Sequence, residues 1–494
     1  MFFILLLPWL LQWANAPPGS IPTGFFAGGV DYHTYIAKMR WFEEGHTAYA
    51  NLYTGEDTEP VRIYQFYWFL GNVAGLTGLP LSWIYHLARS FLGALSVVLM
   101  YRFIKKYSGA EPVLAALFAV LACGGYLTTV DELFGTSFGA DRTDYFLQGR
   151  VWLALLTFPH YMADILGIFL LLEAYLGKKY PLALAGGFLM SVGHSFLAAL
   201  FVPAVLIDGL LKKQPVLCLK TIAFYLAGLA PISLVMALDM RLEWVEIWRA
   251  QTYRETPHPL KFLLVGYGAV GAMGWYGAAI SLCRKKINVW VIWLVLASLM
   301  SYLAPLPNKR EFAFFISIPL GVLAAPVAEG VCRWFVRVTS RQALGVAACA
   351  VFLYLCVWQV PLIYAQTLIS FRPQDTYNCY YVTGEYRDVF KLIDEEKGVV
   401  LCSEWLGNLV PAYTGCRPYV GHLTETLHYS EKKKKLDAFF KGEMDFDEMK
   451  DFLAQNRIRW VIYDVHEKGY RQGPLRELLG DPVFEGKEVV VWRL

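Results

Sequence analysis

Long apolar segments separated by short polar connections make up most of the chain before residue 366. A membrane-spanning helix needs roughly 20 consecutive apolar residues, and most of these segments reach that length. The pattern therefore predicts a bundle of membrane-spanning α-helices. The predicted spans are residues 81–103, 111–130, 151–176, 216–237, 260–282, 288–304, 312–331 and 343–365.

The first apolar segment, residues 2–14, is short for a span and ends near Ala14-Asn15-Ala16. Those residues have the small-x-small form of a signal-peptidase site, but no positively charged segment precedes them. We favour a short first span, with a cleaved signal as the alternative; both place the long polar loop 15–80 outside the membrane. In that loop the aromatic run Tyr64–Leu70 is too short to cross a bilayer and is typical of a segment lying in the membrane interface.

Residues 181–211 would form one overlong helix, yet Lys178-Lys179 precede them and Lys212-Lys213 follow. The positive-inside rule places both basic pairs in the cytoplasm, so we predict two short helices separated at Gly193-His194. A broken helix is tolerated in a membrane where it lines an enclosed cavity.

The other basic clusters fix the predicted orientation of the chain. With the N-terminus inside, they also fall on the cytoplasmic side: Lys105-Lys106, Arg284-Lys285-Lys286 and Arg333, Arg337 and Arg341. This arrangement gives about eleven spans, and it places residues 366–494 outside the membrane. The outer loops are residues 15–80, 131–150, 239–259 and 305–311.

Beyond residue 365 the apolar segments become shorter and alternate in character. Val399–Ser403, Arg459–Asp464 and Val483–Trp492 resemble strands, because they are apolar and rich in β-branched or aromatic residues. Glu385–Lys397 and Tyr429–Asn456 have helical spacing. This alternation predicts a small α/β domain, in which the lysines of the second helical stretch form a solvated face: Lys432–Lys435.

Composition agrees with a polytopic membrane protein. The chain is 56% hydrophobic and only 17% charged, with a mean hydropathy of +0.40. We therefore predict a transmembrane domain, residues 1–365, and an extracytoplasmic domain, residues 366–494. The net charge of +3 does not indicate a nucleic-acid partner, and the nine cysteines form no zinc-binding spacing.

Asp31 is the main candidate for chemistry, because it lies at the start of the first outer loop, close to the membrane surface. Partial desolvation there would raise the basicity of its carboxylate, as a general base requires. The neighbouring Tyr32, His33 and Tyr35 indicate a packed loop and are candidate substrate-binding residues. The alternative is an ordinary solvated aspartate.

A second group of acidic residues lies in the outer loop 131–150. Asp141 and Asp144 are candidate ligands, together with Asp31, for a hard divalent cation such as Mg²⁺ or Mn²⁺, which prefers oxygen ligands. The alternative is that these carboxylates pair with Arg142 and with solvent.

Three cations are candidates for binding a phosphate. Lys309 and Arg310 lie in a predicted outer loop, where the positive-inside rule does not favour basic residues. Their position there indicates a specific role, such as binding an anion. Arg89 lies inside a predicted span with His86 on the same helix face, and a charge there is costly unless it faces a cavity or a partner. Snorkelling of Arg89 to the interface is the alternative.

Buried polar residues in the predicted bundle form a further group. His160 and Asp164 are spaced i, i+4, so we expect them to share a helix face and a hydrogen bond. With His194 they either support the cavity or serve a proton-coupled carrier. In the C-terminal part, His422 and Glu425 lie in a dense polar patch that suits carbohydrate binding or, equally, a buried turn.

This architecture resembles the GT-C superfamily of integral membrane glycosyltransferases, which use sugars carried on polyprenyl phosphates. The resemblance rests on the acidic residue early in a long first outer loop (Gly29-Val30-Asp31-Tyr32-His33), the interfacial segment, the broken helices and the outer C-terminal domain. It implies that Asp31 activates the acceptor. The chain lacks the tandem Trp-Trp-Asp signature of oligosaccharyltransferases.

The expected function is therefore transfer of one sugar, with inversion, from a polyprenyl-phosphate donor to a lipid, glycan or protein acceptor on the outer side. Lys309, Arg310 or Arg89 would hold the donor phosphate. We expect a prokaryotic plasma-membrane protein that contributes to a cell-envelope glycan. The alternative is a transporter or flippase of a lipid-linked glycan that uses His160, Asp164 and His194.

Overall fold

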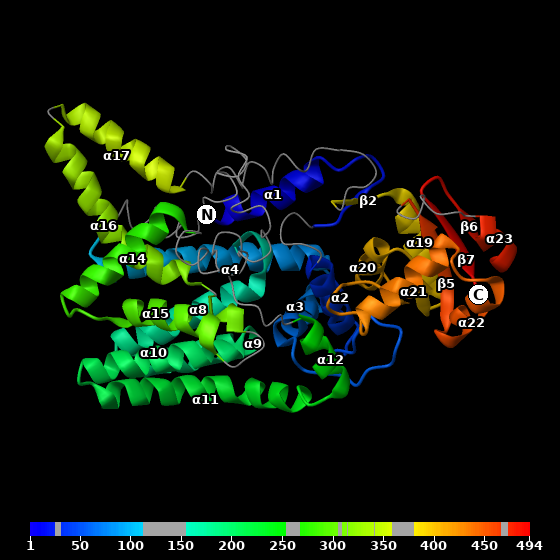
Figure 1. Ribbon diagram of the computed structural model, residues 1–494, viewed down its shortest axis with the longest axis horizontal. Helices are drawn as coiled ribbons and strands as arrows, with labels where there is room; N and C mark the ends of the chain where they lie inside the picture. The colour runs from blue at the N-terminus through cyan, green and yellow to red at the C-terminus, as the bar shows by residue number, and fades with distance from the viewer. Residues whose placement is uncertain are drawn as a thin grey trace. The chain divides into compact units, whose positions relative to one another are not determined.

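A computed structural model describes residues 1–24, 31–111, 155–252, 267–304, 309–313, 315–339, 341–357, 380–465 and 473–494. The chain forms two compact units, each made of segments that are distant in sequence. The helical unit comprises Met1–Pro8, His86–Leu234 and Arg254–Ser370, and the mixed unit comprises Trp9–Tyr85, Val235–Tyr253 and Phe371–Leu494. Figure 1 labels the helices and strands of both units.

Most of the predicted spans are α-helices in the structure. Helix α4 has the predicted bounds, Leu81–Phe103, and α11, Pro215–Asp239, differs from its prediction by one or two residues at each end. Residues 111–130 fall almost wholly outside the described residues. The other long apolar helices are α8 (Pro159–Leu176), α14 (Gly268–Cys283), α15 (Val289–Leu303), α16 (Ser317–Val338) and α17 (Gln342–Val357).

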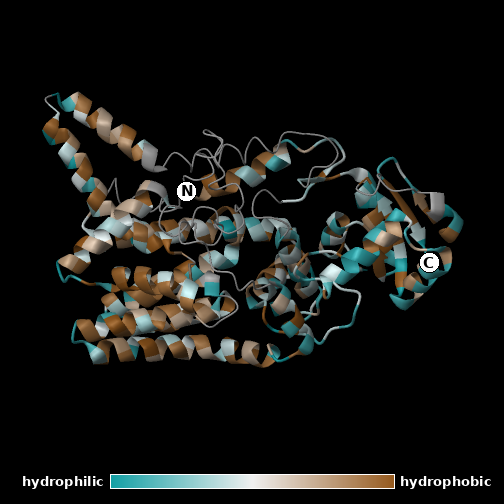
Figure 2. Cartoon of the chain, in the orientation of Figure 1, coloured by the Kyte–Doolittle hydropathy of each residue, from teal (hydrophilic) through white to brown (hydrophobic). Residues whose placement is uncertain are grey.

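Within the described residues, three helices are both long and apolar enough to cross a membrane: Leu81–Ser108, Pro215–Asp239 and Ser317–Val338. Several shorter apolar helices accompany them, including α1, Phe2–Ala14. Hydrophobic residues are frequent along α10 and α11, as Figure 2 shows. The predicted number of spans remains a prediction.

The break predicted at Gly193-His194 is present. Helix α9 covers Tyr180–Val192, and α10, Ala198–Leu211, begins after a short 3-10 turn. At one end of this group Tyr175 of α8 donates to Asp208 of α10, with 2.8 Å between the two oxygens. At the other end Asp164 contacts His194. The basic pairs that follow α8 and α10 therefore lie at the same end, as the positive-inside rule requires.

The mixed unit contains a five-stranded sheet in the order β4-β3-β5-β7-β6. Its first three strands pair in parallel and the last two pair antiparallel to their neighbours. The strands are β3 (Val399–Leu401), β4 (Arg417–Pro418), β5 (Ile458–Asp464), β6 (Phe484–Glu485) and β7 (Val489–Arg493). The helices of this part are α19 (Gly384–Glu395), α20 (Glu404–Tyr413), α21 (Tyr429–Lys441), α22 (Phe446–Gln455) and α23 (Gly473–Leu479).

Two details of this region differ from the sequence prediction. The stretch Tyr429–Asn456 is two helices, because Gly442 takes a left-handed conformation with a φ of 70° and ends α21. The solvated face predicted for Lys432–Lys435 is wrong at Lys432, which is buried and contacts Glu56 at 2.6 Å. Its partner lies in the first loop, so local spacing cannot reveal the pair.

The same unit contains two helices of the long first loop. Helix α2 covers Asp31–Glu43, and α3 covers Gln65–Thr77, which includes most of the aromatic run. They pack closely at Gly71, where a Cβ atom would lie 2.4 Å from the carbonyl oxygen of Met39. At about 1.5 Å per residue, α3 is too short to cross a bilayer. This close packing holds α2, the helix that begins at Asp31, in place against α3.

Candidate functional site

Asp31 begins helix α2 and is in close contact with His422, which lies in the turn that follows β4. The Asp31 Oδ1 atom is 3.0 Å from His422 Nε2. The Asp31 side chain is 47% exposed, whereas that of His422 is only 5% exposed. The carboxylate is therefore held from its buried side and open to solvent on the other.

The hydrogen bonds of His422 define its tautomer. Its Nδ1 atom accepts a hydrogen bond from the backbone N–H of Thr424, with 3.3 Å between the nitrogens, and lies 3.1 Å from the Thr424 hydroxyl. Because an amide nitrogen can only donate, Nδ1 carries the lone pair in the neutral ring and Nε2 carries the hydrogen. The Nε2 edge of the ring is therefore the one that lies against the Asp31 carboxylate.

The turn that carries His422, residues Gly421–Thr426, is held by several elements of the mixed unit. The Thr426 hydroxyl donates to the carbonyl of Tyr53 at 2.9 Å and accepts from the N–H of Gly421 at 3.0 Å. Gln251 of α12 (Glu243–Thr252) donates to the carbonyl of Thr426 at 2.8 Å. These bonds fix the polar patch that the sequence indicated, and they make it a buried turn that presents one imidazole.

An ion pair also joins α2 to this turn. The Lys38 Nζ atom is 2.8 Å from Glu425 Oε1, and the two side chains are only 1% and 7% exposed. The Lys38 ammonium also lies 4.0 Å from the ring centroid of Tyr64, a cation–π contact, and the Tyr64 hydroxyl donates to Glu425 at 3.3 Å. Lys38 was not among the sequence candidates, since its partner is 387 positions away.

The other predicted residues of α2 are mostly packed inside the unit. Tyr32 is 3% exposed and makes an edge-to-face contact with Tyr85, with 4.9 Å between the ring centroids. Tyr35 stacks on Tyr67 at 4.4 Å. His33 is buried, and desolvation together with the nearby His422 lowers its pKa to about 3, so it stays neutral. Of these three, Tyr35 is the only one that is partly exposed.

Arg89 lies in the helical unit and is completely buried. Its guanidinium donates to the backbone carbonyls of Leu5 and Leu155, each at 2.7 Å, and to His86 Nδ1 at 3.3 Å. These bonds connect α4 to Leu5 of α1 and to Leu155, which precedes α8. Snorkelling does not describe this side chain, because it faces protein groups.

His160, Asp164 and His194 also meet in the helical unit, but not as expected. The hydrogen bond expected between His160 and Asp164 is wrong: the Asp164 carboxylate accepts from His194 at its ring Nδ1, 2.6 Å, and at its backbone nitrogen, 2.9 Å. Gly193 permits this approach, since a Cβ there would lie 2.1 Å from Asp164 Oδ1. The His160 and His194 rings lie 5.2 Å apart.

The predicted phosphate-binding loop lies near this histidine cluster. Lys309 and the backbone of Arg310 are in the 3-10 helix Lys309–Ala313. Phe312 of that helix contacts Phe196 at 5.9 Å, and Phe196 contacts the His194 ring at 5.7 Å. The Arg310 side chain and the whole of Asp141 and Asp144 lie outside the described residues. Among the residues that are described, no group of three or more His, Cys, Asp or Glu is placed to hold a metal ion.

Known proteins resemble this chain in structure although not in sequence. No family model and no curated protein matches the sequence. An oligosaccharyltransferase from Archaeoglobus fulgidus, crystallised with a tethered acceptor peptide, matches with a TM-score of 0.55 and 13% identity, covering 94% of this chain and 69% of that one.

Two further structures match over almost the whole chain. ArnT from Cupriavidus metallidurans has a TM-score of 0.53 and 12% identity, covering 99% of this chain and 96% of its own. The mycobacterial arabinofuranosyltransferase AftD has a TM-score of 0.51 and 14% identity, covering 99% of this chain and 41% of its own. These three proteins are GT-C glycosyltransferases, and at such low identity the likeness is one of fold. The chain has the GT-C fold.

Proposed function

We propose that this chain is an integral membrane glycosyltransferase that moves one sugar from a polyprenyl-phosphate donor to an acceptor on the outer side of the membrane. The observation that carries the proposal is the pair formed by Asp31 and His422. A half-exposed carboxylate at the start of a helix is held at one oxygen by a buried imidazole, 3.0 Å away, which leaves the other oxygen available to an acceptor. General bases are positioned in this way.

In the proposed reaction Asp31 accepts the proton of the acceptor hydroxyl. The acceptor oxygen then attacks the anomeric carbon as the bond from that carbon to the phosphate oxygen breaks. The electron pair of the broken bond remains on the polyprenyl phosphate, and a single displacement inverts the anomeric configuration. His422 stays in contact with Asp31 throughout, so it positions the carboxylate and transfers no proton itself.

We assign the leaving phosphate to Lys309 and Arg310, supported by His160 and His194. A cation at that position stabilises the charge that develops on the departing phosphate. Support comes from the aromatic contacts that link the 3-10 helix Lys309–Ala313 to His194. Arg89 remains a weaker candidate, because it would first have to exchange its hydrogen bonds to two backbone carbonyls.

The class of substrate is supported by what the similar structures contain. Structures of the A. fulgidus enzyme hold an acceptor peptide and a dolichol-phosphate. For this chain we propose a lipid, glycan or protein acceptor in a cell envelope, with residues 366–494 outside the membrane and about eleven spans. A divalent cation, Mg²⁺ or Mn²⁺, bound by Asp141, Asp144 and Asp31 also remains a proposal, and no step above passes through it.

A carrier of a lipid-linked glycan is the second candidate. The pair formed by the buried Asp164 and the partly exposed His194 favours it, because proton-coupled carriers use such pairs inside their helical bundles. A carrier would need Asp164 and would not need Asp31.

One experiment separates the two functions. The full chain, purified in detergent, is incubated with a panel of short-chain polyprenyl-phosphate sugars and hydroxyl acceptors, and products are detected by mass spectrometry. A detergent micelle has no second compartment, so a carrier yields no new product there. Formation of a glycosylated acceptor supports the enzyme. Absence of product with every donor, together with glycan transport in proteoliposomes that Asp164→Asn abolishes, would show the carrier.

A further inference from the structure

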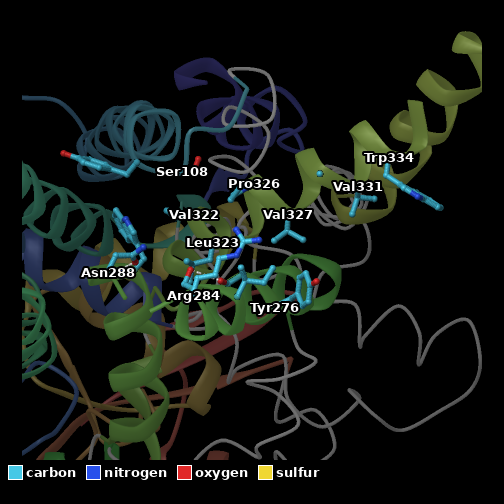
Figure 3. Close-up of a pocket in the computed structure, with 16 residues that line it drawn as sticks. Ser108, Tyr276, Arg284, Asn288, Val322, Leu323, Pro326, Val327, Val331 and Trp334 are labelled. Carbon is cyan, nitrogen blue, oxygen red and sulfur yellow. Dashed lines mark hydrogen bonds between the residues drawn. The ribbon is translucent and has the colours of Figure 1, made fainter. Parts of the chain in front are cut away.

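A pocket of about 590 Å³ opens between α14 and α16 in the helical unit (Figure 3). The two helices cross closely at Gly274 and Gly277, where a Cβ atom would lie 2.7 Å and 2.4 Å from the carbonyl oxygens of Leu320 and Leu323. They then separate, since a Cβ at Gly330 would have nothing within 4 Å. Pro326, inside α16, cannot donate to the carbonyl four residues before it and favours a bend there.

The pocket combines an apolar wall with a cationic end. Its α16 wall repeats at helical spacing, with Leu323, Val327 and Val331 on one face, and Arg284 enters from the end of α14 (Figure 3). Tyr276 and Trp334, which also line it, are 61% and 56% exposed. Exposed aromatic rings beside a basic side chain are typical of the membrane interface.

The side chain of Arg284 has no hydrogen-bond or ion-pair partner among the described residues. Two acidic side chains of the helical unit, Glu329 of α16 and Glu173 of α8, pair with other cations: Glu329 with Arg333 at 3.0 Å, and Glu173 with Lys106 at 3.5 Å. Asn288 caps α15 through its side-chain oxygen, so its amide hydrogens can donate to a further group.

We propose that this pocket binds one anionic glycerophospholipid from the leaflet at the basic end of the bundle. Arg284 and the Asn288 amide would bind its phosphate, and an acyl chain would lie along Val327 and Val331. Basic pockets between membrane helices on the cytoplasmic side suit such headgroups. The site is separate from the proposed donor site, because the Lys309–Ala313 helix is linked to His194, at the opposite end of the α8–α10 group.

The test uses the delipidated full chain in detergent, titrated with phosphatidylglycerol and observed by native mass spectrometry. We expect one bound lipid per chain in the wild type, and roughly tenfold weaker binding in Arg284→Gln, which loses a charge-assisted contact. Lys285→Gln is the matched control, because it removes the same charge from the next residue, which does not line the pocket. Equal effects of the two substitutions would overturn the proposal.

Two further arms identify the ligand. Val327→Trp fills the apolar part of the pocket without changing charge, so it should also abolish binding while circular dichroism stays as in the wild type. Glycerol phosphate, which has the headgroup phosphate and no acyl chains, should not bind. If glycerol phosphate or a short polyprenyl phosphate binds as well as phosphatidylglycerol, or if Val327→Trp binds normally, the assignment to a glycerophospholipid is wrong.

Discussion

Replacing Lys38 by methionine should destabilise the mixed unit strongly. The substitution keeps an unbranched apolar side chain of similar length but removes the ammonium that lies 2.8 Å from Glu425. Glu425 is 7% exposed, and its Oε2 atom already has no hydrogen-bond partner in the described structure. The substitution would therefore leave a buried carboxylate with only the Tyr64 hydroxyl, at 3.3 Å, as a side-chain donor.

The size of this effect follows from the burial of both side chains. Removing one partner of a buried ion pair costs about 3–5 kcal/mol, because the remaining charge stays desolvated and uncompensated. Replacing both partners, in Lys38→Met with Glu425→Gln, removes the buried charge and should recover most of that loss. The double variant also lacks the cation–π contact with Tyr64, which accounts for part of the stability that it does not recover.

The assay is thermal unfolding of the purified chain in one detergent, with hydrogen exchange to locate the change. We expect the single variant to unfold at a temperature lower by several degrees, at roughly 2–4 °C per kcal/mol. Faster exchange should appear first in α2 and in the turn Gly421–Thr426. A double variant as unstable as Lys38→Met, or a single variant within about 0.5 kcal/mol of wild type, would show that the buried Lys38–Glu425 pair does not stabilise the mixed unit.

Three further predictions follow from individual contacts. His422→Ala should lower the turnover of sugar transfer roughly 10- to 100-fold with little change in KM, since it misplaces the base; an unchanged turnover would exclude a positioning role. Gly193→Ala should destabilise the helical unit by about 1–3 kcal/mol in thermal unfolding, because its Cβ would lie 2.1 Å from Asp164, whereas Gly330→Ala has open space and should not. The pKa of His33 is lowered from 6.5 in the unfolded chain to about 3 in the folded protein. Between these two pH values the unfolded chain binds more protons than the folded protein. The stability present above pH 6.5 is therefore lost as the pH falls toward 3. Wild type should thus lose about 2 kcal/mol more than His33→Gln between pH 7 and pH 5, and parallel curves would contradict this.

The regular helices were predictable because hydropathy is a local property. The bounds of α4 and the break at Gly193-His194 both follow from apolar runs and flanking lysines. The candidate site was only partly predictable. Asp31 and His422 were each indicated by their neighbours, but their pairing joins the first loop to the C-terminal part and has no local signal.

Lys38 and Lys432 also have partners that the local sequence does not reveal. Each looks like an ordinary surface lysine in a helix, and each is buried against a glutamate that is distant in sequence. Only the fold brings these partners together. The expected contact between His160 and Asp164 failed for a related reason, because i, i+4 spacing places two side chains on one face but does not exclude a better partner from the next helix.

The most direct test of the account is the rate of sugar transfer by wild type and by Asp31→Asn, with Asp57→Asn as a control. Both substitutions keep the shape of the side chain and remove one carboxylate from the mixed unit, and Asp57 is 80% exposed and paired with Arg417. We predict transfer by wild type and by Asp57→Asn, and a loss of at least about 100-fold in Asp31→Asn with unchanged folding. Equal rates in the three proteins would contradict the claim that Asp31 is the catalytic base.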